Sequence, residues 1–371
     1  MIPTRFAPPL ALAAMLLTAP AASADIVIGV AGPFSGPNAT LGEQLKRGVQ
    51  LAVDDINGTG GLRGERLAVE YADDGCDPRK AVEVATAFVA LGVTFVAGHY
   101  CSGASIPAAK VYADAGILEI TPASTHPKVT DGGDWNVIRV CPRDDAQGTV
   151  AAERVLEEFP SQKVAILNDQ SPAAVDVTNR FRERLAAASV TPVLDESYKP
   201  GLKDYEDLAL RLRDARADIV YIGGSYVEAG QIIRALRDVG SNARLMSNDA
   251  LVTEDFWKIA KEAAEGTLMT FTFDPQNFED ARPVIERFKA EGYNPEGYTL
   301  YAYAAVQTWL SAATATGSTD SHRIADWLKA GNHVRTVTGD IAFDSKGGLR
   351  NPRFAWYRWE NAKYVDEAIG R

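Results

Sequence analysis

Short apolar runs and amphipathic stretches alternate along the chain. The run Ile26–Val30 is rich in β-branched residues, which predicts a buried strand. Apolar side chains then recur at helical spacing from Leu45 to Ile56, and the glycine-rich stretch Gly58–Gly61 ends that helix. The pattern therefore begins with one strand followed by one helix.

The same alternation continues and starts again after Asp144. Further strands are predicted at Leu67–Tyr71, Val93–Val96, Ile117–Ile120, Val164–Leu167, Ile219–Ile222 and Leu245–Ser247. Helices are predicted at Ala81–Val89, Ala146–Glu158, Val175–Ala188 and Glu228–Val239. Strands and helices in alternation fold as parallel sheets covered by helices on both faces, so we expect an α/β fold with two similar halves.

The C-terminal part follows a different pattern. Gly339–Asp344 alternates between apolar and polar positions and ends at the turn Ser345–Gly348. Phe354–Trp359 and Tyr364-Val365 flank a polar tetrapeptide, which predicts a β-hairpin.

Parallel sheets bind ligands in the crevice beyond the carboxyl ends of their strands. The loops that follow the predicted strands are therefore the candidate binding segments: Ser35–Gly42, His99–Ser105, Thr121–Pro127, Asn168–Ala174, Gly223–Tyr226 and Ser247–Leu251.

The first 24 residues have the features of a secretory signal peptide. Arg5 supplies a positive charge, Leu10–Leu17 is an unbroken apolar run, and Ala22-Ser23-Ala24 is a small-residue cleavage signal. The apolar run is shorter than the roughly 20 residues that span a bilayer. We expect cleavage after Ala24 and a periplasmic protein without direct membrane insertion; a buried N-terminal helix is the less favoured alternative.

Size and charge narrow the class of protein. Removal of residues 1–24 leaves 347 residues, enough for two domains. These carry 37 basic and 49 acidic side chains, a net charge of −12, without a cluster of lysine or arginine. Such a chain is a poor partner for nucleic acid or anionic lipid, which leaves an exported carrier or enzyme.

Three cysteines occur in the mature chain. In an exported protein two cysteines more often form a disulfide than a metal site, and no C-x-x-C pair is present. We expect Cys76 to pair with Cys101, because both follow strands expected to be adjacent, and Cys141 to be an unpaired buried thiol. Closing this 25-residue interval stabilises the fold by about 3–4 kcal/mol in the loop-entropy model.

Few patterns indicate catalysis. The chain has no phosphate-binding loop and no G-x-S-x-G elbow, and its four histidines lack metal-ligand spacing, so we expect no cofactor and no metal. His99 and Ser102 lie close together, and an exported hydrolase that uses either residue is the alternative from another functional class. We expect the protein not to be an enzyme.

Two of the candidate loops carry hydroxyl groups directly before predicted helices. Ser102 and Ser105 lie in one, and Ser124 and Thr125 lie in the other. Hydroxyl and free N–H groups at a helix N-terminus form an anion site. Serine and threonine also cap helices routinely, so capping is the alternative interpretation.

Three segments are distinctive: Asp74–Pro78, Gly98–Ser102 and Tyr301–Gln307. With further stretches across the mature chain, they resemble the periplasmic branched-chain amino-acid-binding proteins. These are the leucine/isoleucine/valine-binding members of the type I solute-binding family that serves ABC importers. The resemblance also implies a disulfide at the positions of Cys76 and Cys101.

The resemblance implies two Rossmann-like lobes with parallel central sheets, joined by a hinge of three crossovers and closing around one ligand. We expect residues 25–144 plus 273–351 to form lobe 1 and residues 145–272 plus 352–371 to form lobe 2.

The resemblance also implies a head-group site. A serine and a threonine of one lobe, with a loop carbonyl, hold the ligand's carboxylate and ammonium in this family, and the matching positions are Ser102, Thr125 and the backbone of Ala123. An acidic residue of the other lobe usually pairs with the ammonium. Asp249 matches that position, where glutamate is common. A loop-capping role is the alternative for Asp249.

The side-chain half of the implied pocket departs from the leucine-type pattern. Two positions that often carry tyrosine are Ala173 and Ser225 in this chain. Tyr298 keeps an aromatic wall, and Leu41 stands where an aromatic residue is frequent. A larger or more polar cavity follows, so the ligand's head group is predictable and its tail is not.

The function implied is that of a monomeric periplasmic solute-binding protein, which captures an amino acid and delivers it to the permease subunits of an ABC transporter. An aromatic or polar amino acid, or an aromatic acid or amide, is the alternative ligand. A sensory subunit that presents ligand to a signalling receptor is a further alternative.

Overall fold

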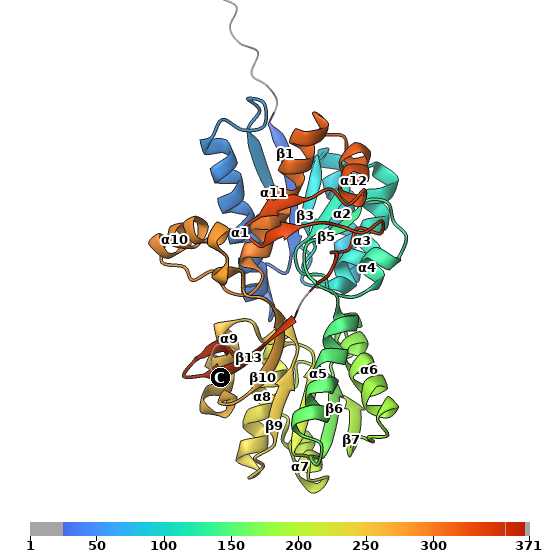
Figure 1. Cartoon of the computed structure of the whole chain (residues 1–371), viewed down its shortest axis with the longest axis vertical. Coiled ribbons are helices and arrows are strands. Elements are labelled where there is room, and N and C mark those ends of the chain that lie inside the picture. The colour runs from blue at the N-terminus through green and yellow to red at the C-terminus, as the bar shows by residue number, and fades with distance from the viewer. Residues whose placement is uncertain (1–24, 353, 368–371) are drawn as a thin grey trace, which may run out of the picture.

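Two α/β lobes, one above the other, make up the molecule (Figure 1). The computed structural model describes residues 25–352 and 354–367. The signal-peptide prediction for residues 1–24 lies outside the described residues. Within the described ranges no helix is long and apolar enough to cross a membrane.

The upper lobe in Figure 1 is built on a five-stranded parallel sheet. Its strands, in spatial order, are β2 (Leu67–Asp73), β1 (Ile26–Gly32), β3 (Phe95–Gly98), β4 (Leu118–Thr121) and β5 (Val137–Arg139). Its helices are α1 (Ala39–Gly58), α2 (Pro78–Leu91), α3 (Ser102–Ala115), α4 (Lys128–Asp131), α10 (Arg282–Ala290), α11 (Thr299–Thr316) and α12 (Ser321–Lys329). A short antiparallel pair, β11 (Val334–Thr336) and β12 (Gly339–Ile341), packs beside α11.

The lower lobe contains a seven-stranded mixed sheet. Its strands, in spatial order, are β14 (Lys363–Asp366), β13 (Phe354–Glu360), β10 (Leu268–Thr272), β9 (Arg244–Ser247), β8 (Ile219–Gly223), β6 (Val164–Asn168) and β7 (Leu194–Ser197). The five from β10 to β7 run parallel, whereas the hairpin β13–β14 is antiparallel, as the C-terminal pattern predicted. Its α-helices are α5 (Asp144–Glu158), α6 (Pro172–Ala187), α7 (Glu206–Asp214), α8 (Tyr226–Asp238) and α9 (Glu254–Ala260).

Three segments cross between the lobes. The chain leaves the upper sheet after β5, returns after β10, and crosses again before β13. The predicted α/β class, with parallel sheets in two lobes, is confirmed. The residue boundaries given above for the lobes stay a prediction.

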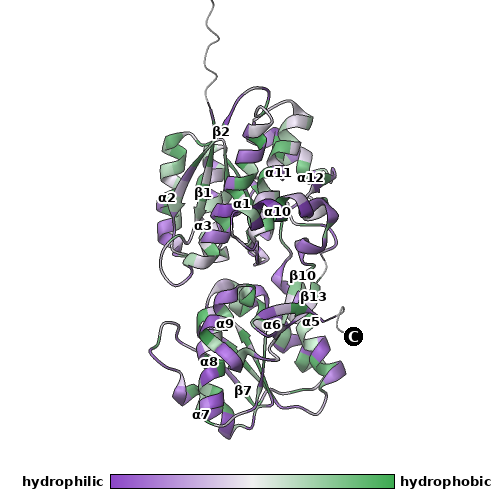
Figure 2. Cartoon of the chain, turned by 90° about the vertical axis from the view of Figure 1, so that its left-hand side faces the viewer, coloured by the Kyte–Doolittle hydropathy of each residue, from purple (hydrophilic) through white to green (hydrophobic). Residues whose placement is uncertain are grey.

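The covering helices are amphipathic. Figure 2 shows hydrophobic and hydrophilic residues side by side on them. In α1 the buried residues Leu45, Val49 and Val53 recur at helical spacing, because one face of the helix packs on the sheet and on α11. The hydrophobic pattern that predicted these elements is thus the pattern of burial.

The disulfide Cys76–Cys101 is present, with the two Cα atoms 5.4 Å apart. Cys141 is unpaired and buried, as predicted. The premise that the two strands before these cysteines are adjacent in the sheet was wrong. The strands before the paired cysteines, β2 and β3, are not neighbours but lie on either side of β1, and their carboxyl ends still lie at the same edge of the sheet.

Close helix packing gives a first testable prediction. A Cβ atom at Gly48 of α1 would lie 2.2 Å from the carbonyl oxygen of Thr299 and 2.6 Å from the Cβ of Ala302 on α11. Gly48→Ala is therefore expected to destabilise the protein by about 1–3 kcal/mol, because α11 must shift. Gly58→Ala at the end of the same helix meets open space and is the matched control. Equal urea-unfolding midpoints for both variants would contradict this packing.

Candidate functional site

Six loops meet at one cavity between the lobes. Its volume is about 210 Å³. Each of the six candidate loops contributes residues to the wall of this cavity, and Cys76 and Tyr298 complete the wall. The residues from the loops are Asn38, Tyr100, Cys101, Ser102, Gly103, Ala123, Thr125, Asp169, Ser171, Pro172, Ala173, Ala174, Gly224, Ser225, Asn248, Asp249 and Ala250. The rule that ligands bind beyond the carboxyl ends of parallel strands thus located the cavity from sequence.

Seven of the eight predicted binding residues line this cavity: Ser102, Ala123, Thr125, Ala173, Ser225, Asp249 and Tyr298. Leu41 does not. Helix α1 begins at Ala39, so Leu41 lies in its first turn, half-buried against the hydrophobic core, rather than in a loop. Its role at the ligand's tail stays a prediction.

Ser102 supplies a hydrogen-bond donor from the upper lobe. It is the first residue of α3 and is 5% exposed. Its Oγ accepts a hydrogen bond from the backbone N–H of His126 at 3.1 Å, so its own proton is available to an acceptor in the cavity. The first N–H groups of a helix also lack intrahelical acceptors.

Capping of the helices α3 and α4 does not explain the hydroxyl groups in the two loops before them. Helices α3 and α4 have Cys101 and Pro127 at their N-caps, and neither makes a side-chain capping bond. Ser105 and Ser124 instead bond each other at 2.8 Å, and Ser124 Oγ also donates toward the carbonyl oxygen of Tyr100 at 3.0 Å. The capping interpretation is wrong for this cluster, whose bonds tie one loop to the other.

Buried polar groups fix the loop that carries Ser102. His99 is fully buried, with Nδ1 2.7 Å from Asp74 Oδ2 and Nε2 3.0 Å from the hydroxyl of Tyr112. The carbonyl oxygen of His99 accepts from Thr121 Oγ1 at 2.7 Å. Asp74 Oδ1 accepts from the N–H of Cys76 at 2.7 Å, so the same carboxylate orients both the imidazole and the disulfide.

Asp249 supplies the acidic group from the lower lobe. It begins a 3-10 helix, Asp249–Leu251, which follows β9 after one residue, and is 8% exposed. Its Oδ2 accepts a hydrogen bond from the hydroxyl of Tyr298 in the upper lobe, and its Oδ1 has no hydrogen-bond partner among the described residues. Burial raises the pKa of Asp249, and the Tyr298 bond opposes that rise. The carboxylate therefore bonds across the cleft and keeps one oxygen free.

The remaining wall is formed by small and polar residues. Ser171 caps α6 by accepting from the N–H of Ala174 at 3.4 Å, and Ser225 caps α8 by accepting from the N–H of Val227 at 3.1 Å. Asp169 is a second carboxylate on this wall, and no lysine or arginine lines the cavity within the described residues. The sequence analysis did not single out Asp169, although it lies in one of the six loops.

Polar contacts join the lobes around the cavity. The hydroxyl of Tyr226 donates to the carbonyl oxygen of Pro37 at 3.0 Å, and the hydroxyl of Thr40 donates to Asp255. Nε2 of Gln44 donates to the carbonyl oxygen of Val252 at 3.4 Å. The two lobes are therefore in contact, and the cleft between them is closed on this side.

Comparison with known proteins agrees with this arrangement. The sequence matches the profile of the periplasmic binding protein family over residues 25–363. The chain belongs to the periplasmic binding protein family. Family membership implies a periplasmic location.

Its relatives in this family are similar over nearly their whole length. The Leu/Ile/Val-binding protein homolog 1 of Brucella suis is 41% identical over 350 residues, which cover 94% of each chain. The amino acid binding protein of Pseudomonas aeruginosa is 41% identical over 343 residues, covering 92% of this chain and 91% of that one.

A solved structure shares the fold and carries a ligand. The branched-chain amino acid transporter substrate binding protein LivJ from Streptococcus pneumoniae, in complex with isoleucine, matches with a TM-score of 0.85 at 26% identity. The match covers 92% of this chain and 99% of that chain. The two lobes and their crossovers are therefore those of a binding protein of this family.

The geometry argues against the hydrolase alternative in this family member. Both ring nitrogens of His99 face Asp74 and Tyr112, so the imidazole is not placed as a base for Ser102. Ser102 Oγ contacts a backbone N–H instead.

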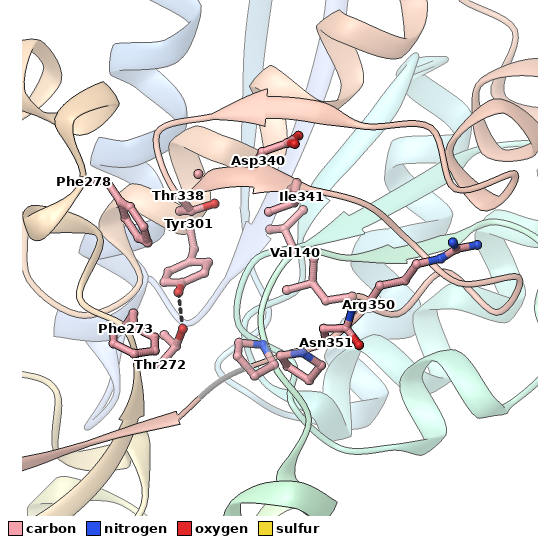
Figure 3. Close-up of a pocket in the computed structure, with 14 residues that line it drawn as sticks. Val140, Thr272, Phe273, Phe278, Tyr301, Thr338, Asp340, Ile341, Arg350 and Asn351 are labelled. Atoms are coloured by element: carbon pink, nitrogen blue, oxygen red, sulfur yellow. Dashed lines mark hydrogen bonds between the residues drawn. The ribbon is translucent and has the colours of Figure 1, made fainter.

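A second cavity lies at the hinge of this binding-protein fold. Its volume is about 440 Å³, and all three crossing segments line it, through residues such as Val140, Thr272 and Asn351 (Figure 3). The hydroxyl of Tyr301 donates to Thr272 Oγ1 at 2.7 Å, and the guanidinium of Arg350 points away from the cavity. None of the six loops reaches this cavity, so the candidate head-group residues belong to the cleft alone.

Proposed function

We propose that this protein captures an α-amino acid between its lobes in the periplasm and delivers it to the membrane subunits of an ABC transporter. The observation that carries the proposal is the placement of hydroxyl and N–H donors from one lobe opposite a carboxylate from the other lobe, around one cavity. A zwitterion has the complementary pair of charges. Charge-assisted hydrogen bonds are the stronger ones, and burial strengthens them further.

Each head-group residue has a role in this proposal. The hydroxyls of Ser102 and Thr125, with the N–H groups at the start of α3, hold the carboxylate. The carbonyl of Ala123 and the carboxylate of Asp249 hold the ammonium. No covalent step is required, because closing the lobes is what retains the ligand and signals its presence.

The tail of the ligand faces the wall that contains Ala173 and Ser225. These small residues favour a ligand that brings its own bulk or polar groups, since an unfilled methylene-sized gap costs about 1 kcal/mol. The Brucella suis relative is named for leucine, isoleucine and valine. Aromatic and polar amino acids remain the alternative ligands, and an aromatic acid or amide would leave Asp249 without a partner.

Calorimetric titration tests the proposal. Mature protein, refolded to remove co-purified ligand, is titrated with leucine, isoleucine, valine, phenylalanine, tyrosine, polar amino acids and benzoate. Saturable binding of an amino acid supports the head-group assignment, and the best ligand identifies the tail. Binding of benzoate alone would refute the role of Asp249, and sustained turnover of ester or amide substrates would revive the hydrolase alternative.

Ser102→Ala is expected to weaken amino acid binding on the order of 10- to 100-fold, because a hydrogen bond to a charged group is lost. Ser171→Ala is the matched control: it removes a serine hydroxyl from the same cavity, but one that caps a helix. The control is expected to lose stability and to change the Kd less than about threefold. Calorimetric titration of both variants with the best ligand measures the two Kd values. Equal losses of affinity in the two variants would refute the assignment of Ser102.

We further infer that lobe 1 comprises residues 25–144 and 273–351 and that lobe 2 comprises residues 145–272 and 352–371. We also infer that the mature chain begins at Asp25 and that the protein is a monomer. The membership of strands in the two sheets supports the division. Permease and ATPase genes beside the gene for this protein would favour transport over a sensory role.

A further inference from the structure

A second carboxylate lies buried beside the head-group residues. Asp144 is the first residue of α5, at the end of the first crossing segment, and is fully buried. Neither of its carboxylate oxygens has a well-formed hydrogen bond within the described residues, and the same holds for Oδ1 of Asp249 and Oε1 of Gln147. Buried acids are normally paired, so these free oxygens require an explanation.

The nearby cation, Arg139, makes its hydrogen bonds to other groups, and its Nε has no hydrogen-bond partner among the described residues. The guanidinium of Arg139 donates to the carbonyl oxygens of Thr125 and His126 at 3.2 and 2.9 Å, and to Thr130 Oγ1 at 3.0 Å. No ion pair joins it to Asp144 in the part of the chain that the structure describes. Asp144 therefore has no direct positive partner.

The surroundings disfavour charge on Asp144. Burial raises its pKa well above the usual range, and the neighbouring charges of Asp249 and Asp176 raise it further. Arg139, the side chain of Thr125 and the N-terminus of α5 oppose this rise.

The other titratable groups that face the two acids give no compensating cation. They are the buried thiol of Cys141 and the hydroxyls of Tyr100, Tyr221 and Tyr298, each with its pKa raised by burial. All four are neutral at ordinary pH.

Two neighbouring carboxylates that are almost entirely buried cannot both carry a charge at low cost, because they repel each other and have little access to water. Either a proton or an external cation must neutralise one of them. The ammonium of an amino acid is such a cation, and Asp249 lines the cavity that would receive it.

We infer that the ligand's ammonium and a single proton compete for the Asp144–Asp249 pair, so that capture of an amino acid expels a proton from the cleft. This inference rests on the proposed function. Asp144 does not line the cavity, so it acts through Asp249 and through Thr125 as a positioning residue rather than as a direct ligand contact.

The sign of the pH dependence follows from this competition. Where the empty pair holds its proton, binding releases it, and affinity rises with pH by up to tenfold per pH unit. Above the pKa of the empty pair the affinity levels off. The free amino acid keeps both of its charges between about pH 5 and about pH 7, so this dependence comes from the protein.

Calorimetry in two buffers measures the proton directly. L-leucine is titrated at about pH 6 in phosphate and in imidazole, whose ionisation enthalpies differ, and the other amino acids of the panel replace it if it gives no heat. We expect a release of roughly half to one proton per ligand, and a Kd that falls several-fold between about pH 5 and about pH 7. Buffer-independent heats with clear binding would overturn the inference and leave the proposed function intact.

Three variants locate the proton. Asp144→Asn keeps the shape of the side chain and removes the repulsion, so proton release should fall towards zero and the Kd should become nearly independent of pH. Asp145→Asn is the matched control, because Asp145 is paired with Arg143 at 2.8 Å; it should behave as the wild type. Proton release that vanishes in His126→Gln instead would assign it to the imidazole and overturn the inference.

The remaining outcomes are also decisive. If Asp144→Asn does not fold, as judged by circular dichroism, the buffer dependence and the pH profile of the wild type decide alone. If no amino acid binds at any pH, the proposed function fails, and this inference fails with it.

Discussion

Asp249→Asn is expected to weaken binding of an α-amino acid by about 2–5 kcal/mol, or roughly 30- to 4,000-fold in Kd. Asp249 is nearly fully buried when the lobes are closed, so an ammonium beside it would lose its water on closure. An amide of the same shape supplies no negative charge to compensate for that loss. The Kd for the best amino acid, measured by calorimetry at neutral pH, checks this result.

The cavity provides a matched control for this experiment. Asp169 is a carboxylate on the same wall, and its Oδ1 accepts from the N–H of Ser171 at 2.9 Å. Asp169→Asn makes the same change in charge and keeps that acceptor, so we expect less than about a threefold change in Kd. A large loss with Asp169→Asn and a small one with Asp249→Asn would place the ammonium at Asp169. A benzoate-type acid should tolerate Asp249→Asn.

Replacement of both Cys76 and Cys101 by serine is expected to reduce the free energy of unfolding by about 3–4 kcal/mol, because the unfolded chain regains the freedom of a 25-residue loop. The melting temperature should fall by roughly 5–15 °C. Binding should weaken as well, since both cysteines line the cavity and Cys101 precedes Ser102. Thermal unfolding followed by circular dichroism measures the first effect, and calorimetry measures the second.

A reducing agent provides the control for the disulfide. Reduction of the wild-type protein should lower its melting temperature to that of the double variant and leave the variant unchanged. Cys141 is present in both proteins and buried in the described structure, so its contribution to the melting temperature is the same in both. A wild-type protein whose stability and affinity ignore complete reduction would show that the bond does not support the ligand loops.

The sequence predicted the position of the cleft because parallel sheets obey a simple rule. Strands that are apolar and β-branched, such as β1 and β8, are visible in the hydrophobic pattern, and the cavity lies beyond their carboxyl ends. The loops after them follow directly. The pattern starts again after Asp144 and so predicted two similar halves, but the division into two lobes joined by three crossovers came from the resemblance.

Elements whose pattern is broken by charge were missed. Strand β5 contains the fully buried Arg139, which interrupts an apolar run, and the bonds of its guanidinium to loop carbonyls are formed only in the folded chain. Strand β7 lies at the edge of its sheet and alternates exposed with half-buried positions, so its polar residues resemble a loop.

Individual contacts in the site were hardest to foresee. Tyr298 was expected to form a wall for the ligand's tail; it lines the cavity, and its hydroxyl also donates to Asp249 across the cleft, which no pattern in the sequence indicated. Asp144 is followed by Asp145, and two acids in the first turn of a helix are typical of a solvent-exposed start. Asp144 is buried only where the two lobes meet. The order of apolar and polar residues along the sequence does not show which segments of the two lobes meet.

Every residue of the cavity wall except Tyr298 and Cys76 lies in one of six strand-end loops, outside the sheets that hold the lobes together. A mutation at Ala173 therefore changes the wall without touching the sheets, whereas one at Ser225 also removes the cap of α8. A duplicated gene could exchange the Ala173 codon and retain its sheets, the other residues of the site and its hinge while the specificity of the protein changed. In evolutionary terms, selection for a new ligand specificity can act on this wall while the fold is retained.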